Sequence, residues 1–136
     1  MIVLDTSILS LAFRRREQHV EASPVAELRN LIARDTPMAI PGIVLQELLS
    51  GVRTRDRLRL LDQALGSFPL LLATRKTHVR AAEVANACRS KGIAVTSDDC
   101  LIAAHAILSN AALFTVDRDF ERIASHCGLR LHRKRQ

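Results

Sequence analysis

The sequence is poor in aromatic residues: it has four Phe, no Trp and no Tyr. Hydrophobic residues nevertheless make up 48% of its 136 residues, so the core must be built mainly from Leu, Ile, Val and Ala. The same shortage leaves few rings on which the bases of a nucleic acid could stack. Any binding of nucleic acid would therefore depend on charge and shape rather than on stacking.

Cysteine is also scarce. Cys88, Cys100 and Cys127 form no CxxC pair, and three cysteines cannot all pair within one chain. This usage is typical of a reduced compartment and predicts a cytoplasmic protein. No apolar run approaches the roughly 18 residues that span a membrane, and no basic region precedes the apolar start of the chain. We therefore expect neither a membrane segment nor a signal peptide.

Several catalytic motifs are absent. There is no Walker-type glycine loop and no GxGxxG, so nucleotide-cofactor chemistry has no support. Ser7 and Ser97 lack the GxSxG setting of a nucleophilic serine. The five His and three Cys show no zinc-ligand spacing, and the adjacent pair His126 and Cys127 does not supply one.

Positive charge is abundant. The net charge is +6, and basic residues gather at 14–16, 53–59 and 130–135. Such a balance favours polyanionic partners through phosphate contacts, although solvated surfaces that keep the protein soluble would look the same. The length suits a single domain, residues 1–136, with a basic tail from about residue 130.

The hydrophobic pattern predicts alternating strands and helices. Short apolar runs predict strands, and apolar residues at helical spacing predict helices. Ser23-Pro24, Pro41-Gly42 and Ser97 are expected to begin helices, with Ser97 as a cap. The expected strands are residues 1–4, 38–40, 68–73, 113–116 and 129–131, and the expected helices lie near 23–32, 42–50, 58–65, 75–91, 97–109 and 120–124.

Alternation of this kind predicts an α/β fold in which a parallel sheet lies between two layers of helices. Ligands of such sheets bind beyond the carboxyl ends of the strands. Asp5 and Asp117 each follow an apolar run, so both are expected at that edge.

Four of the fourteen acidic residues stand out by their context. Asp5 and Asp117 close strands, Asp99 lies in the first turn of an apolar helix, and Glu47 lies within the apolar run 44–49. Each alone has a structural explanation, because Asp5 and Asp117 could cap turns, Asp99 could favour the positive end of its helix, and Glu47 could face solvent.

Together, the four acids indicate a cation site. Carboxylates held close together raise one another's pKa, and a hard dication such as Mg²⁺ compensates their charge with oxygen ligands. A metal held in this way can activate a water and neutralise charge on a phosphodiester. A basic surface around the site would retain the polyanion.

The same residues resemble the PIN domain, and specifically the toxin ribonucleases of VapBC-type toxin–antitoxin pairs. Residues 2–7 (IVLDTS) resemble the opening strand and first acid of the family, and residues 40–51 resemble its glutamate helix. Residues 97–104 (SDDCLIAA) resemble a D-x-L-I-A-A block, and residues 115–120 (TVDRDF) a T-x-D-x-D-F block. The four blocks occur in the family's order and cover nearly the whole chain.

This resemblance implies a three-layer PIN-like fold with a central, mainly parallel five-stranded sheet. It further implies an endoribonuclease that depends on Mg²⁺, with Mn²⁺ as a substitute, and that forms a homodimer. A VapB-type antitoxin would inhibit it, and operator DNA would be contacted only through that antitoxin.

Four catalytic residues follow from the resemblance. Asp5 and Asp99 would be direct metal ligands, and the register of the third block selects Asp99 over Asp98. Glu47 and Asp117 would complete the site, while Asp119 is expected at its rim. Thr6, Ser7 and Thr115 could orient waters or carboxylates by hydrogen bonding.

Two other functions remain open at this point. An inactive PIN-like module could use the basic surface to hold RNA or a protein, and it would bind without turnover. A phosphoacceptor signalling domain also has an acidic pocket at its strand ends, but Lys76 and Lys91 are badly placed to serve it.

Overall fold

The computed structural model describes residues 1–14 and 23–133. Arg15 and Arg16 of the first basic group, and Lys134 and Arg135 of the tail, lie outside the described residues. Five strands form one sheet: β1 (Ile2–Leu4), β2 (Met38–Pro41), β3 (Leu70–Leu71), β4 (Ala112–Phe114) and β5 (Arg130–Leu131).

The sheet has the order β3-β2-β1-β4-β5, and every pairing in it is parallel. From β1 the chain builds outward through β2 to β3, and it then crosses to the other side of β1 for β4 and β5. The direction of winding thus changes between β1 and β4, which is where sheets of this kind form a crevice beyond the strand ends. The predicted parallel five-stranded sheet is confirmed.

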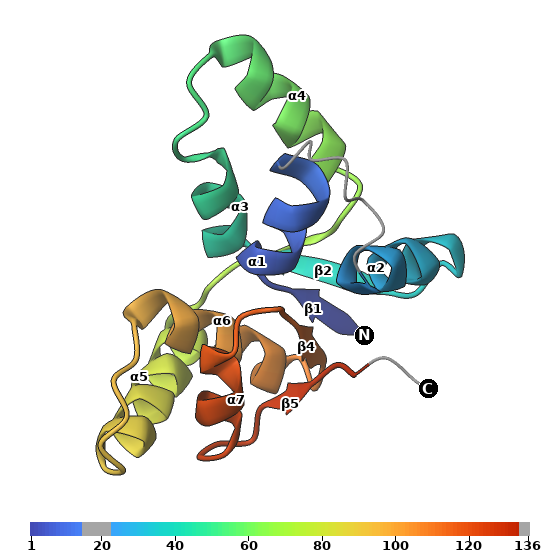
Figure 1. Cartoon of the computed structure of the whole chain (residues 1–136). Helices are drawn as coiled ribbons and strands as arrows, with labels where there is room; N and C mark the ends of the chain where they lie inside the picture. Colours follow the sequence, from blue (N-terminus) through green and yellow to red (C-terminus); the bar gives the residue numbers. More distant parts are fainter. Residues whose placement is uncertain (15–22, 134–136) are drawn as a thin grey trace.

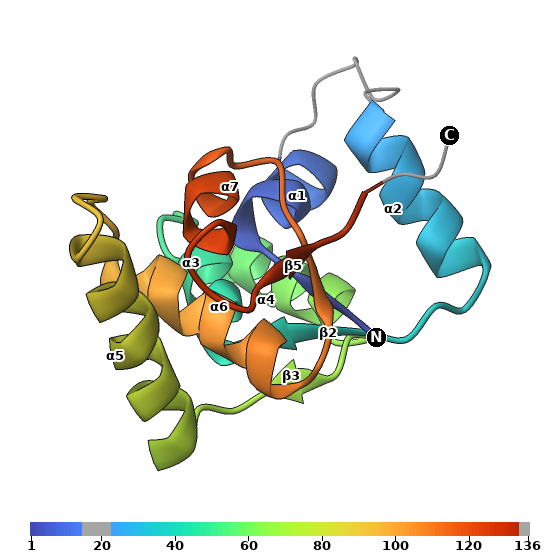
Figure 2. The same ribbon diagram turned by 90° about the horizontal axis from the view of Figure 1, so that it is seen from below.

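Helices cover both faces of the sheet, as Figure 1 shows: α3 and α4 lie above β1 and β2, and α5 and α6 lie below them. Figure 2 shows α2 beside the opposite side of the sheet from α5. The described helices are α1 (Thr6–Leu9), continued by the π-helix η1 (Ser10–Arg14), then α2 (Ser23–Ala33), α3 (Gly42–Leu49), α4 (Arg55–Leu65), α5 (Arg75–Arg89), α6 (Ser97–Leu108) and α7 (Asp119–Ala124).

Three helices end close to where the sequence predicts, because a residue just beyond each of them has a left-handed backbone conformation. Gly51 and Gly92 lie just beyond α3 and α5 with φ values of 86° and 73°, and Asn110 beyond α6 has a φ of 51°. These left-handed conformations stop a helix, and Gly adopts them at little cost.

Four strands are shorter than predicted; β1 and β5 each begin one residue later, and β3 and β4 differ more. Residues 68–73 contribute only β3, because the Phe68 amide still donates to the Leu65 carbonyl at the end of α4, and Thr74 caps α5 at the other side. Residues 113–116 contribute β4 only up to Phe114, because the Val116 amide donates to the Ser7 hydroxyl instead of continuing the ladder.

The core is mainly aliphatic, as the composition predicts. Val3, Leu4, Ile8 and Leu113 are fully buried, together with the aromatic Phe120. All three cysteines are free thiols, of which Cys88 and Cys100 are buried. Among the described residues, no helix combines the length and apolar character needed to cross a membrane.

Candidate active site

The first acid of the site, Asp5, is held by a dense set of hydrogen bonds. Asp5 directly follows β1 and caps α1, and it is only 3% exposed. Its Oδ1 accepts from the Thr6 amide (2.6 Å), and its Oδ2 accepts from the Ser7 amide (3.3 Å), the Ser7 hydroxyl (2.6 Å) and the Thr115 hydroxyl (2.6 Å). These donors satisfy a buried charge that would otherwise be costly, and they fix the orientation of the carboxylate.

The two hydroxyls join Asp5 to the end of β4. Thr115 Oγ1 accepts from the Asp117 amide at 3.0 Å while it donates to Asp5. Ser7 Oγ accepts from the Val116 amide at 3.0 Å while it also donates to Asp5. Each hydroxyl has one proton and uses it on Asp5, so the 3.2 Å separation between the two hydroxyl oxygens is a contact rather than a hydrogen bond. The strand ends of β1 and β4 are thereby locked together.

Asp99 lies in the first turn of α6. The cap of this helix is Thr96, whose hydroxyl accepts from the Asp99 amide at 3.1 Å. The prediction that Ser97 is the cap is wrong: Ser97 is already the first helical residue, and Thr96 has the extended backbone that a cap requires. The pKa of Asp99 is raised from 3.8 to about 6, first by burial and then by the charges of Asp117, Asp5 and Glu47, against the lowering effect of the hydrogen bond with Thr96.

Glu47 reaches the site from α3. Its Oε1 accepts from the Thr6 hydroxyl at 3.0 Å, which ties it to the first residue of α1. Burial raises the pKa of Glu47; the hydrogen bond from Thr6 lowers it, and the charges of Asp98 and Asp5 add to the increase. Glu47 therefore belongs to the same electrostatic cluster as Asp5 and Asp99.

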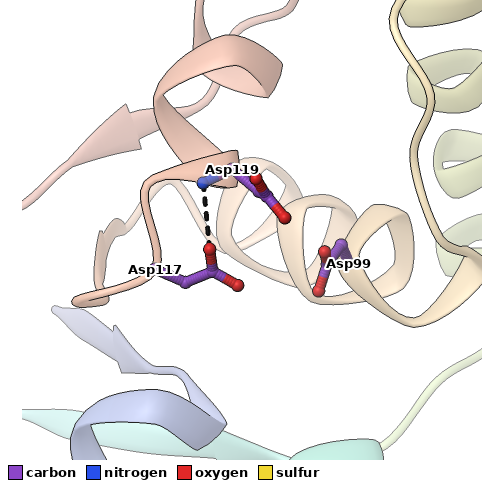
Figure 3. A group of neighbouring side chains, drawn as sticks. All are labelled: Asp99, Asp117 and Asp119. Atoms are coloured by element: carbon purple, nitrogen blue, oxygen red, sulfur yellow. Dashed lines mark hydrogen bonds between the residues drawn. The ribbon is translucent and has the colours of Figure 1, made fainter.

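Asp117 and Asp119 lie beside Asp99, as Figure 3 shows. Carboxylate oxygens of the three residues all lie within 4.8 Å of one another. Asp117 Oδ1 accepts from the Asp119 amide at 2.9 Å, and Asp119 pairs with Arg122 at 2.8 Å. The Asp119 side chain is 57% exposed, as a residue at the rim of the site would be, and Asp117 rather than Asp119 accepts the bond that holds the turn before Phe120.

The donor set of the cluster is made only of oxygen atoms. In the part of the chain that the structure describes, Asp99, Asp117 and Asp119 are the one group of three or more metal-ligating side chains this close together. Oxygen donors of high charge suit Mg²⁺ or Mn²⁺ better than zinc or copper. Asp5 is outside this group of three, so its direct ligation of a metal stays a prediction.

Comparison with known proteins identifies the family. The PIN domain family matches residues 2–125. The chain belongs to the PIN-domain family. "Ribonuclease VapC2" of Rickettsia felis is 30% identical to this PIN domain over 128 residues, which are 89% of this chain and 90% of that protein.

Solved structures agree with this membership. A chain of VapBC2 from Rickettsia felis, crystallised bound to a DNA fragment from the promoter, superposes on this PIN domain with a TM-score of 0.75 and 27% identity, covering 97% of this chain and 98% of that one. FitAcB from Neisseria gonorrhoeae has the same TM-score at 20% identity, with 98% and 97% covered. The predicted PIN-like fold of the VapC type is thus confirmed.

The sequence analysis missed one feature of this PIN domain's site, which is Thr96 as the cap of α6; its position three residues before Asp99 could have indicated this role. The sequence analysis placed Asp119 at the rim but did not count it among the acids that could hold a metal, although its spacing of two from Asp117 was available as a signal.

Proposed function

We propose that this PIN domain is a Mg²⁺-dependent endoribonuclease that acts as the toxin of a type II toxin–antitoxin pair. The observation that carries the proposal is the clustering of acids from four separate parts of the chain at the β1–β4 crevice: the end of β1, α3, α6 and the segment after β4. Burial, followed by repulsion from neighbouring acids, raises the pKa of two of these acids, Asp99 and Glu47, which is typical of functional sites. The relationship to a protein named ribonuclease VapC2 supports RNA as the substrate.

Asp99, Asp117 and Asp119 fit a divalent cation by proximity, and Asp5 fits it by its place at the same edge of the sheet. The family resemblance implied direct ligation by Asp5 and Asp99, and we retain both as ligands. Asp5 Oδ1 accepts only one of the four hydrogen bonds, so this oxygen keeps capacity for a cation. When bound, Mg²⁺ or Mn²⁺ would activate a water and neutralise charge developing on the phosphodiester.

The chain's own residues supply the rest of the chemistry. Ser7 and Thr115 hold Asp5 in one orientation, and Thr6 does the same for Glu47. A preorganised set of carboxylates needs little rearrangement during reaction, which is the main source of electrostatic catalysis. Glu47 and Asp117 complete the site as catalytic residues.

RNA binding would rely on the basic surface. Arg53 and Arg57 line a hollow of about 440 Å³ with the apolar Phe13 and Leu60, and the net charge is +6. Phosphate contacts made by such residues weaken steeply with salt. We expect RNA binding to fall as salt rises and to show little dependence on base stacking.

The partners follow from the family. Solved relatives include VapBC complexes bound to DNA, so we propose a VapB-type antitoxin, with operator DNA contacted only through it. We also propose a cytoplasmic homodimer. Light scattering of the purified chain would test the dimer. Co-expression with the small protein encoded by the adjacent upstream reading frame would test the antitoxin, through restored growth.

Cleavage of labelled RNA with and without Mg²⁺ tests the activity, comparing wild type with Asp5→Asn. Asp35→Asn is the matched control, because Asp35 is exposed, precedes β2 at the opposite edge of the sheet and has a φ of 52° that Asn tolerates. We expect cleavage by wild type and the control in Mg²⁺, none in EDTA, and a loss of at least about 100-fold in Asp5→Asn. Equal cleavage by all three proteins would refute the site.

The second function to consider is an inactive binding module. Salt-dependent RNA binding without turnover at any Mg²⁺ or Mn²⁺ concentration would favour it. The complete set of acids at the strand ends counts against it.

A further inference from the structure

A buried acid–base pair lies next to the acidic site and is not part of it. Glu27 of α2 and His132, which follows β5, are joined by Oε2 and Nε2 at 3.0 Å. Their side chains are only 9% and 17% exposed. A carboxylate buried to this degree requires a donor or a cation as partner, and His132 supplies it.

This pair reaches the strand that carries the site. The His132 amide donates to the Leu113 carbonyl of β4 at 2.8 Å, and the imidazole lies 5.1 Å from the Phe114 ring, centroid to centroid. Thr115 follows directly. Glu27, His132 and Thr115 also line one hollow of about 180 Å³ together with Phe114 and neighbouring residues.

Stability alone does not explain such a pair. Replacing both members of a buried polar pair by apolar residues of similar shape is often neutral or stabilising, because desolvation offsets the attraction. What the pair adds is a fixed geometry among α2, β4 and the segment after β5. That geometry matters at Thr115, whose hydroxyl bonds of 2.6 Å to Asp5 and 3.0 Å to the Asp117 amide tolerate little movement.

We propose that Glu27 and His132 form a positioning pair for the metal site, acting through Phe114 on the Thr115 hydroxyl. The pair touches neither substrate nor metal. It holds the carboxyl end of β4 so that Thr115 can orient Asp5 and Asp117 at once. This inference rests on the proposed function, since it assigns Thr115 to the support of a metal site.

The test replaces both members, Glu27→Leu with His132→Leu, so that no unpaired charge is left in the interior. Arg130→Ala is the matched control. Arg130 also anchors β5 to the β4 side, through Nη2 to the Asn110 carbonyl (3.0 Å) and to Asn110 Oδ1 (3.3 Å), but at the amino end of β4, away from the site. Calorimetric titration of the RNA-free proteins measures the affinity for Mg²⁺, and steady-state kinetics separates kcat from KM.

We expect the double variant to bind Mg²⁺ about 10-fold more weakly, the size of effect seen when outer partners of metal ligands are removed. Its kcat should fall while the KM for RNA stays unchanged, and Arg130→Ala should match wild type in Mg²⁺ affinity. Glu27→Gln, which keeps a hydrogen bond to His132, should retain Mg²⁺ affinity within about twofold.

Unchanged Mg²⁺ affinity in the folded double variant would overturn the inference. If that variant does not fold, Phe114→Leu takes its place, because it removes the ring contact and leaves the pair intact; wild-type affinity there would overturn the inference equally. Failure of the proposed function looks different: wild type itself would then neither bind Mg²⁺ nor cleave RNA.

Discussion

Replacing Asp99 by Asn should stabilise the metal-free protein at neutral pH. The folded-state pKa of Asp99 is about 6, against 3.8 for the free side chain. The folded protein therefore binds more protons than the unfolded chain between these pH values, so stability falls as pH rises through this window and stays low above it. Asparagine removes this dependence because it does not ionise.

The size of the effect follows from the shift. About two pKa units correspond to about 3 kcal/mol, which we reduce to about 1–2 kcal/mol because Asp99 retains some exposure to solvent and gains from the positive end of α6. For a domain of this length, 1 kcal/mol moves the Tm by about 4 °C. Asp99→Asn should therefore raise the Tm by about 4–8 °C at pH 7.5 in EDTA.

The assay is thermal unfolding followed by circular dichroism at 222 nm, because the chain has no Trp or Tyr to report by fluorescence. Asp56→Asn is the control, since Asp56 lies in the first turn of α4 with a side chain that is 83% exposed. It should lower the Tm slightly, through the lost interaction with the helix dipole. A Tm of Asp99→Asn at or below that of wild type at pH 7.5, or a gain of equal size at pH 4, would refute the reasoning.

Three further predictions use the same measurements. Thr96→Ala should cost about 1 kcal/mol through the lost cap, whereas Ser97→Ala should be close to neutral; the reverse order would restore Ser97 as the cap. Thr115→Val should lower Mg²⁺ affinity about 10-fold in a titration, because Asp5 loses a 2.6 Å donor, and unchanged affinity would contradict the role of this hydroxyl. Burial, helped by the charge of His78, lowers the pKa of His105, so stability that is present above pH 6.5 should be lost as the pH falls below it. In urea unfolding, the free energy of unfolding of His105→Gln should fall less on acidification than that of wild type. An equal fall in both proteins would exclude His105 as the source of the acid loss.

The sheet could be predicted from sequence because its signals are local. Each strand is a short apolar run, and alternation with amphipathic helices limits the topology to a parallel sheet. The residues at which β3 and β4 begin and end could not be predicted in this way. At Val116, for example, the chain leaves the ladder because its amide bonds the Ser7 hydroxyl, a partner 109 positions away.

The site was predictable where an acid directly ends a strand. Asp5 is such a residue, and its place in the first motif block gave the same answer. The role of Asp119 depends instead on how the first turn of α7 is oriented. That turn is set by the bond from the Asp119 amide to Asp117 Oδ1, a contact that apolar periodicity does not register.

The burial and pairing of Glu27 could not be predicted from sequence, for a different reason. Its position in α2 reads as one charged residue on an amphipathic helix, and charged residues are rarely buried unless they are paired. The partner, His132, is 105 positions away, beyond the last strand, so nothing local distinguishes this glutamate from an exposed one. Only the packing of α2 against the segment after β5 brings the two together.

The acids of the site differ in how far hydrogen bonds within the protein compensate their negative charge. Asp5 is buried yet has four donors, so its negative charge is compensated within the protein. Asp99 has no such set of donors: burial, and then the charges of Asp117 and Asp5, raise its pKa against the lowering hydrogen bond with Thr96. A dication would relieve repulsion at Asp99 far more than at Asp5. Binding of Mg²⁺ should therefore stabilise wild type against heat more than it stabilises Asp99→Asn, with the difference largest where Asp99 is ionised, above pH 6.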